Sequence, residues 1–230
     1  MIVYGKNPVF EAVKAAKAHK IYIRKGAALY GANFNLPVQM MNKGEFDSRF
    51  HREAQGIAAE VDEITPVCLD DVTEEILKVK GVVILDRIQD PNNYGAIIRS
   101  AHCFGIKHII APRYHQANIS PAVCKASAGA IFYTTVIEET NLSAVCARLK
   151  GMGYTVTACD TQAEKTLKEA KFSGKTAVII GSEGRGVRSG LLQNADQIVR
   201  IPIQGRIDSL NAAGSAAIAL YEIFGESFNE

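Results

Sequence analysis

Short apolar runs rich in β-branched residues alternate with helix-patterned segments from Gly81 onward. The runs predict six buried strands, at residues 82–85, 108–111, 134–137, 154–158, 177–180 and 197–201. The clearest helical patterns lie between or after them, at residues 94–104, 142–152 and 209–224. Apolar strands that alternate with helices are typical of a mostly parallel sheet with helices on both faces. This part of the chain is therefore predicted to be an α/β domain.

A smaller α/β unit is predicted ahead of this domain. Asn7-Pro8 is a typical helix start, and residues 20–24 alternate like a strand that is exposed on one face. A helix over 43–52 and a strand over 56–61 complete the unit. Pro66 and the acidic pairs that follow it mark a boundary. We therefore expect a first domain, a linker and a second domain, at residues 1–66, 67–77 and 78–230.

The composition excludes several classes of protein. With 47% hydrophobic and 22% charged residues, the chain has the balance expected of a soluble globular protein. Its net charge of +2 is too small to indicate nucleic-acid binding by itself. No apolar run is long enough to span a bilayer, and the first residues lack a signal-peptide pattern. The five cysteines contain no Cys-x-x-Cys pair, so we expect a reduced, cytoplasmic protein with no metal site and no membrane partner.

Three polar or glycine-rich stretches begin where predicted strands stop. They are Asp90-Pro91-Asn92-Asn93-Tyr94-Gly95 running on to Arg99, Gly181-Ser182-Glu183-Gly184-Arg185-Gly186, and Ile201-Pro202-Ile203 with Gly205 and Ser209-Leu210-Asn211. In an open parallel sheet, ligands bind beyond the carboxyl ends of the strands. The three stretches therefore predict one site.

Each stretch also has a plainer structural interpretation. The first consists of turn residues, and Arg99 would then be a solvated helix residue. The second is not the dinucleotide motif Gly-x-Gly-x-x-Gly, and no acidic residue follows at the end of the next strand. Its glycines let backbone approach a ligand, and Glu183 is either a helix-start anion or a site carboxylate. In the third, Ser209 is expected to cap a helix.

In order, spacing and residue type, the three stretches resemble the motifs of the SpoU (TrmH-type) family of SPOUT RNA 2′-O-ribose methyltransferases, close to the 23S rRNA (guanosine-2′-O-)-methyltransferase group. The family pattern Asn-x-Gly-x-x-x-Arg is met by Asn93, Gly95 and Arg99. The segment from Gly5 to Ala12 is similar to the ribosomal-protein-like RNA-binding domain of many relatives. The resemblance implies S-adenosylmethionine as cofactor, a homodimer, and a trefoil knot against which general folding rules argue.

The resemblance also implies roles for eight residues and no metal. The implied cofactor-binding residues are Gly181, Ile201 and Leu210. The implied catalytic residues are Arg99, Asn93, Glu183, Ser209 and Asn211. The arginine that matches Arg99 is the family's proposed general base. A guanidinium stays protonated in proteins, so a bidentate phosphate clamp is the easier role for it. Relatives commonly carry Val-Ser where this chain has Ala212-Ala213, so Ala213 carries no role.

We therefore expect an enzyme that methylates the ribose 2′-hydroxyl of a guanosine in structured RNA. The front domain favours ribosomal RNA, and its basic residues predict phosphate contacts. These residues are Lys6, Lys14, Lys17, Lys20, Arg24 and Lys25. Apolar residues of the helix at 209–224 predict a two-fold dimer. A tRNA 2′-O-methyltransferase and a non-catalytic RNA-binding ribosome-assembly protein stay open as alternatives, whereas the missing dinucleotide motif excludes a nicotinamide-dependent oxidoreductase.

Overall fold

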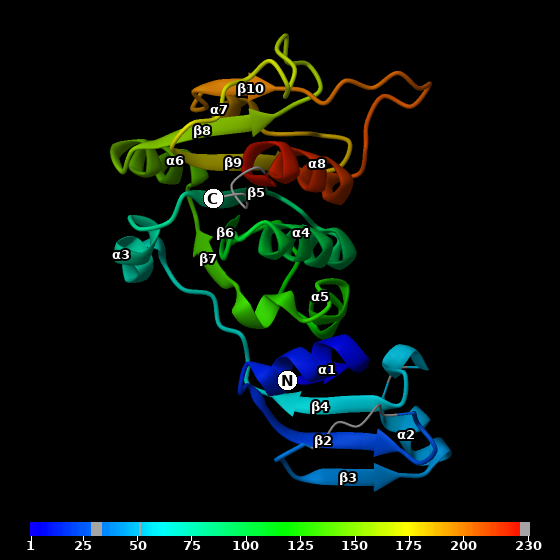
Figure 1. Cartoon of the computed structure of the whole chain (residues 1–230). Helices are drawn as coiled ribbons and strands as arrows, with labels where there is room; N and C mark the ends of the chain where they lie inside the picture. Colours follow the sequence, from blue (N-terminus) through cyan, green and yellow to red (C-terminus); the bar gives the residue numbers. More distant parts are fainter. Residues whose placement is uncertain (29–33, 51, 226–230) are drawn as a thin grey trace.

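The computed structural model describes residues 1–28, 34–50 and 52–225 (Figure 1). Its larger part contains a six-stranded sheet in the order β10-β8-β9-β5-β6-β7, in which all neighbouring strands are parallel. The strands are β5 (Gly81–Asp86), β6 (His108–Pro112), β7 (Thr135–Glu139), β8 (Tyr154–Cys159), β9 (Lys175–Gly181) and β10 (Gln197–Val199). The predicted α/β fold with a mostly parallel sheet is confirmed.

Helices cover both faces of this sheet. They are α3 (Thr73–Ile76), α4 (Pro91–Cys103), α5 (Pro121–Ala126), α6 (Leu142–Gly151), α7 (Ser189–Leu192) and α8 (Ala212–Phe224). Val83 of β5 belongs to a core shared with α4, α5 and α8, and Ile84 belongs to a core shared with α3, α6 and α7. Successive side chains of a strand point to opposite faces, so a fully buried strand such as β5 needs cover on both sides.

The front part of the chain forms a second sheet in the order β1-β4-β2-β3. Strand β3 is parallel to β2, and the other neighbours are antiparallel. The elements are β1 (Ile2–Tyr4), α1 (Lys6–Lys14), β2 (Ala18–Arg24), β3 (Val38–Met41), α2 (Lys43–Arg49), η1 (Arg52–Ala54) and β4 (Ile57–Val61). Helix α1 begins at Lys6, so Asn7-Pro8 lies inside its first turn rather than at its start.

Helix α1 packs against the larger part of the molecule, at α5 and the 3-10 turn η3 (Ala130–Tyr133). The hydroxyl of Tyr133 donates a hydrogen bond to Glu11 Oε2 at 2.9 Å. Desolvation and the Glu11 carboxylate raise the pKa of Tyr133 to about 12, so its hydroxyl remains a donor at neutral pH. The front part therefore contacts the larger part directly, through α1, in addition to the connection along the chain.

Residues 67–77, the expected linker, pack on the edge of the parallel sheet. Val67 forms a parallel bridge with Ile137 of β7, and the Leu69 N–H donates to Glu139 Oε1 at 2.8 Å. The 3-10 turn η2 (Leu69–Val72) and α3 follow. They bury three apolar side chains in the core beneath α6, those of Leu69, Val72 and Ile76.

Helix α8 begins at Ala212, three residues later than predicted. Asn211 caps it, because its Oδ1 accepts a hydrogen bond from the Gly214 N–H at 2.7 Å. The expected capping role of Ser209 is therefore wrong: asparagine caps as well as serine does, and Asn211 is the residue that precedes the first turn. Within the described chain, neither α8 nor another helix is long and apolar enough to cross a membrane. The trefoil knot stays a prediction.

Candidate functional site

The first two predicted motifs leave adjacent strands of the parallel sheet. Strands β5 and β9 are neighbours, and their last residues, Asp86 and Gly181, are paired in register. The turn into α4 therefore lies beside the glycine-rich loop that follows β9. A hydrogen bond joins the two segments: Asn93 Nδ2 donates to Glu183 Oε1 at 2.8 Å. Two predicted site residues that are far apart in the sequence are thus in direct contact.

Asp90 determines where Asn93 points. Its carboxylate accepts hydrogen bonds from the backbone N–H groups of Asn92 and Asn93, at 3.1 and 3.4 Å, and so caps α4. Pro91 occupies the first helical position, where a missing N–H costs nothing. The side chain of Asn93 is buried, with 7% exposed, so its amide is held in the orientation that reaches Glu183.

At two positions of the motifs, Gly95 and Gly181, another segment of the chain packs so closely that only glycine fits. A Cβ on Gly95 would lie 2.5 Å from Ala126 Cβ, so glycine lets α4 pack directly on α5. A Cβ on Gly181 would lie 2.2 Å from the carbonyl carbon of Gly186, where the loop after β9 folds back on the strand end. The loop is closed by the Gly186 N–H, which donates to the carbonyl oxygen of Ser182 at 2.9 Å.

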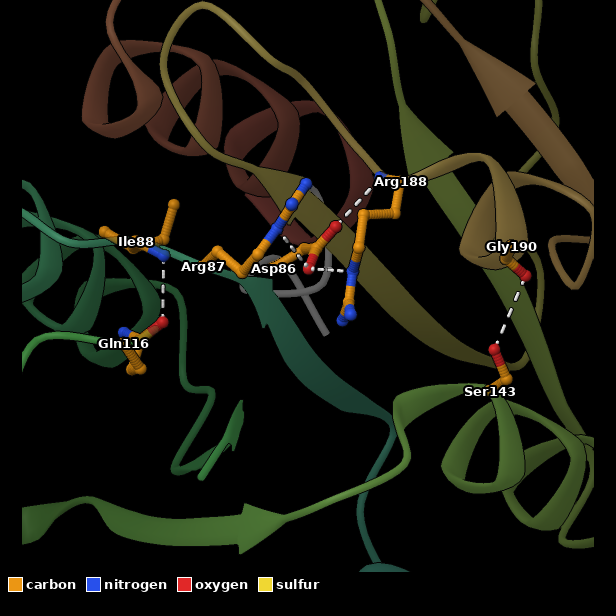
Figure 2. Close-up of polar contacts among 7 residues, drawn as sticks. All are labelled: Asp86, Arg87, Ile88, Gln116, Ser143, Arg188 and Gly190. Atoms are coloured by element: carbon orange, nitrogen blue, oxygen red, sulfur yellow. Dashed lines mark hydrogen bonds and ion pairs between the residues drawn. The ribbon is translucent and has the colours of Figure 1, made fainter. Parts of the chain in front are cut away.

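A buried carboxylate connects the same two segments beneath the site. Asp86 is fully buried at the end of β5 and accepts hydrogen bonds from the backbone N–H and the Nε of Arg188, each at 2.8 Å. Figure 2 shows Asp86 between Arg188 and Arg87, whose Nε lies 3.3 Å from Asp86 Oδ1. Because Arg188 follows the glycine-rich loop, Asp86 holds the end of that loop against β5.

Two adjoining cavities open at this edge of the sheet. The larger, the Asn93 cavity, has a volume of about 500 Å³ and is lined by the turn into α4, the segment after β6 and part of the glycine-rich loop. The smaller, the Gly181 cavity, has a volume of about 260 Å³ and is lined by the glycine-rich loop, the end of β8 and the segment before α8. Ser182, Glu183 and Ala212 line both cavities. Ligands in the two cavities would therefore be neighbours.

The residues of the Gly181 cavity fit S-adenosylmethionine. The glycine-rich loop presents backbone to this cavity, with open space at Gly184 that suits a flat adenine, and Leu210 supplies apolar surface. The carboxylates of Asp160 and Glu183 also line this cavity, and negative charge suits a ligand that carries a sulfonium and an ammonium group.

The cysteine in the wall of the Gly181 cavity is not a nucleophile. Burial, together with the smaller effect of the neighbouring Asp160 carboxylate, raises the pKa of Cys159 to about 12. The thiol therefore stays protonated at neutral pH, and only a thiolate attacks efficiently. Among the residues that the structure describes, no group of three or more His, Cys, Asp or Glu side chains is placed to hold a metal ion.

The eight predicted site residues divide into two groups. Five line one or both cavities: Asn93, Gly181, Glu183, Ser209 and Leu210. Arg99, Ile201 and Asn211 line neither. Ile201 is half-buried after β10, and Asn211 is engaged in capping α8. Arg99 is exposed, and six helical positions place it about 120° around the axis of α4 from Asn93.

Sequence reasoning missed several residues at this edge: Asp86, Arg87, His115 and Arg188. The sequence could have indicated Asp86, because a lone carboxylate at the end of a wholly apolar strand must find a partner. No local pattern indicated Arg188, because it contacts a residue that lies 102 positions away in the sequence, Asp86. Arg87 and His115 have a left-handed backbone, with φ of 61° and 63°, which their residue types do not predict.

Two family models match the chain. The SpoU rRNA Methylase family matches residues 80–221, which include all six strands of the parallel sheet. The RNA 2′-O ribose methyltransferase substrate-binding family matches residues 2–67, which include the front sheet. The resemblance found in the three motifs is thus confirmed over both parts of the chain.

Individual proteins agree with the family models. The 23S rRNA (guanosine-2′-O-)-methyltransferase RlmB of Coxiella burnetii is 32% identical over 192 residues, which are 82% of this chain and 76% of that protein. YacO of Bacillus subtilis, named as a TrmH-family tRNA/rRNA methyltransferase, is 30% identical over 96% of this chain and 94% of its own length. The fold matches the structure of the SpoU methyltransferase AviRb from Streptomyces viridochromogenes, bound to AdoMet, with a TM-score of 0.80 at 22% identity, over 100% of this chain and 91% of AviRb. The chain therefore belongs to the SpoU rRNA methylase family of S-adenosylmethionine-dependent RNA 2′-O-ribose methyltransferases.

Proposed function

We propose that this protein methylates the ribose 2′-hydroxyl of a guanosine in ribosomal RNA. The observation that carries the proposal is the wall shared by the two cavities, because methyl transfer needs donor and acceptor side by side. The Gly181 cavity suits the methyl donor, and the Asn93 cavity is large enough for a nucleotide. The name of the Coxiella relative and the match of the front sheet to a substrate-binding family support ribosomal RNA as the substrate.

Asn93 and Glu183 are the residues to which we assign the reacting hydroxyl. Glu183 Oε1 is occupied by the Asn93 amide, so Oε2 remains to accept a hydrogen bond from the ribose hydroxyl. Asn93 thereby holds the Glu183 carboxylate in place rather than leaving it to rotate in solvent. S-adenosylmethionine supplies a methyl group on a positively charged sulfur, and the protein supplies position and a proton acceptor.

The loop before α8 completes the cofactor side. Gly181 and Leu210 line the Gly181 cavity directly, and we assign Ile201 to the apolar support of this loop. Ser209 lines the same cavity and offers a hydroxyl to the cofactor. Asn211 contributes indirectly, because its cap on α8 fixes the point at which the loop ends.

A homodimer would explain why Arg99 lies outside the cavities of its own chain. Arg99 is exposed on α4, which packs against α8, and α8 leaves two large apolar side chains exposed, Ile218 at 42% and Tyr221 at 64%. A two-fold contact through α8 would cover these side chains and bring α4 of one protomer toward the other. We therefore assign Arg99 to the RNA bound in the partner's cavity, as a bidentate phosphate clamp.

The proposed activity has a direct test in two steps. We expect the purified protein to bind S-adenosylmethionine in calorimetry and to transfer a methyl group to ribosomal RNA in vitro. Ribosomal RNA from a deletion strain should lack one 2′-O-methylguanosine, as seen by mapping 2′-O-methylation. A methyl lost only from tRNA would replace the proposed substrate with tRNA. Failure to bind the cofactor would favour a non-catalytic RNA-binding protein.

The role of Arg99 across the dimer predicts complementation between two inactive variants. Arg99→Lys and Gly181→Ala dimers should each be inactive, since the first lacks the guanidinium fork and the second a formed cofactor loop. Co-expression should restore about a quarter of the activity, because half of randomly assembled two-fold dimers are mixed and each mixed dimer has one intact site. An Arg99 that acts within its own chain would give no recovery. Sedimentation supplies the control, and a monomer at micromolar concentration would contradict the dimer.

A further inference from the structure

Three donor side chains converge on the Asn93 cavity from separate segments. Arg87 follows β5, His115 follows β6, and Arg185 lies in the glycine-rich loop after β9. Two of the three carry a permanent positive charge, since arginine is not deprotonated in proteins. None of the three is among the eight residues to which the family resemblance assigns a role.

Two carboxylates near this cavity are engaged within the protein: Asp90 caps α4, and Asp86 lies beneath the cavity with Arg188 as its hydrogen-bond partner. Glu183 accepts a hydrogen bond from Asn93 with one oxygen and keeps the other for the ribose hydroxyl. In contrast, Arg185 and His115 form no ion pair or hydrogen bond through their side chains with the residues that the structure describes. Away from Glu183, the unsatisfied capacity of the Asn93 cavity is therefore that of donors and cations, which suits an anion.

The backbone at this cavity is held in a conformation that long side chains rarely adopt. Arg87 and His115 have φ of 61° and 63°, in the left-handed region where glycine is favoured. A hydrogen-bonded connection keeps the two segments together: the Ile88 N–H donates to Gln116 Oε1 at 2.9 Å (Figure 2), and the Ala117 N–H donates to the Ile88 carbonyl at 2.9 Å. Two strained residues that line one cavity indicate a functional demand on their side chains.

Arg87 is the most firmly placed of the three donors. Its side chain is 22% exposed, and its Nε lies 3.3 Å from the buried Asp86 carboxylate without forming a hydrogen bond. Both Nη groups remain without a partner among the described residues. Asp86 thus holds the inner end of the guanidinium, and the outer fork is available to a ligand. A fork of this kind matches the paired oxygens of a phosphate better than a single carbonyl does.

We propose that Arg87, His115 and Arg185 bind the RNA phosphate next to the methylated ribose. This inference rests on the proposed function, because it places the target nucleotide in the Asn93 cavity beside the cofactor. Arg87 makes the main contact, and Arg185 and His115 approach the same phosphodiester from the other walls. The site recognises the RNA backbone and not a base, so it contributes affinity and position for any sequence.

Arg87→Gly is the sharpest test, because glycine adopts a φ of 61° freely and the fold should be kept. Because Asp86 keeps both hydrogen bonds from Arg188, we expect a folded protein with only a small change in Tm and with unchanged S-adenosylmethionine affinity. The affinity for the substrate RNA should fall about tenfold or more at low salt, and the slope of log affinity against log salt should decrease by about one. RNA binding is measured by fluorescence anisotropy, so this result does not depend on methyl transfer.

Two control variants separate the loss of the phosphate contact from the change in backbone strain and from the loss of one positive charge. Ala16→Gly removes a left-handed alanine, with φ of 55°, from an exposed position of the front unit, and RNA affinity should not change. Arg113→Gln removes an exposed arginine that does not line the Asn93 cavity, and its effect should stay below threefold. Equal effects of Arg113→Gln and Arg87→Gly would overturn the proposal, because the cavity would then act only through general charge.

A second variant covers the case in which Arg87→Gly does not fold. Arg185→Gln changes an exposed loop residue, and it should also lower the salt slope while cofactor affinity is kept. Wild-type RNA affinity and salt slope in Arg185→Gln, or in a folded Arg87→Gly, would show the proposal to be wrong. A wild-type protein that binds RNA but methylates none would contradict the proposed function alone, because the phosphate contact would still be visible in binding.

Discussion

Replacing Gly181 with alanine is expected to remove methyltransferase activity almost completely. The new Cβ would lie 2.2 Å from the Gly186 carbonyl carbon, 2.4 Å from the Val187 nitrogen and 2.5 Å from the Gly186 oxygen. Carbon atoms in ordinary contact lie about 3.5–4.0 Å apart, so the segments must separate by about 1 Å or more. All three clashing atoms belong to the backbone, and no side chain can rotate away to relieve them.

The consequence reaches both cavities. Gly181 lines the Gly181 cavity, and Glu183, which follows it by two residues, lines both cavities. Because a misplacement of about 1 Å at a reacting centre can cost a hundredfold, we expect kcat/KM to fall by about a hundredfold or more. Overpacking should destabilise the fold by about 1–3 kcal/mol. Calorimetry with S-adenosylmethionine, and urea unfolding, measure the two effects separately.

Gly190→Ala is the matched control for Gly181→Ala. Gly190 lies in α7 with no atom within 4 Å of an added Cβ and no left-handed φ. Its carbonyl oxygen accepts hydrogen bonds from Asn194 and from Ser143 (Figure 2), and a Cβ disturbs neither. This variant should keep wild-type activity and stability within about 1 kcal/mol. A Gly181→Ala protein with cofactor affinity within threefold of wild type would contradict the role of the close approach.

Replacing Asp86 with alanine is expected to cause the largest loss of stability among polar substitutions at the site. The fully buried carboxylate accepts two hydrogen bonds from Arg188, and its removal leaves the backbone N–H and the Nε of Arg188 without an acceptor and Arg87 without its ion-pair partner. Breaking a buried pair costs about 3–5 kcal/mol, but the Arg188 side chain is 45% exposed and can regain water. We therefore expect a loss of about 2–4 kcal/mol.

This loss is measured by urea unfolding, with Asp47→Ala as control. Asp47 pairs with Arg24 at 3.6 Å on the surface, where both side chains are about a third exposed, and an exposed pair contributes at most about 1 kcal/mol. Asp86→Ala should also weaken cofactor binding, because Asp86 holds the end of the glycine-rich loop. A stability change equal to that of Asp47→Ala would mean that the buried contact contributes little.

Much of the site was predictable because its motifs are local and follow strands. A strand of buried residues must end where polar residues begin. The residue pattern therefore predicts that Asn93 follows β5 and that Gly181 lies at the end of β9. In a parallel sheet all such ends lie on one edge. The residue pattern therefore predicts that Asn93 and Glu183 lie close together, and the 2.8 Å hydrogen bond between them confirms this.

Helix termini were less predictable, because several residues in a row can serve as the cap. Ser209 and Asn211 both have suitable side chains, and both precede the small-residue helix. Asn211 caps α8 because the packing of α8 against α4 and β9 sets where the helix begins. Tertiary contacts, and not local propensity, therefore decide which of these two residues caps the helix.

The amino-acid sequence by itself determined the α/β class, the position of the three motifs at strand ends and the membership of the SpoU family, since each of these depends on residue order over short distances. Only the tertiary structure decided that Asp86 would meet Arg188, that Arg87 and His115 would take a left-handed backbone beside one cavity, and that Arg99 would lie outside it. These features depend on contacts between segments that are far apart in the chain, or on which face of a helix is packed against the rest of the protein. No local pattern carries that information, because the partner that determines each conformation lies elsewhere in the sequence.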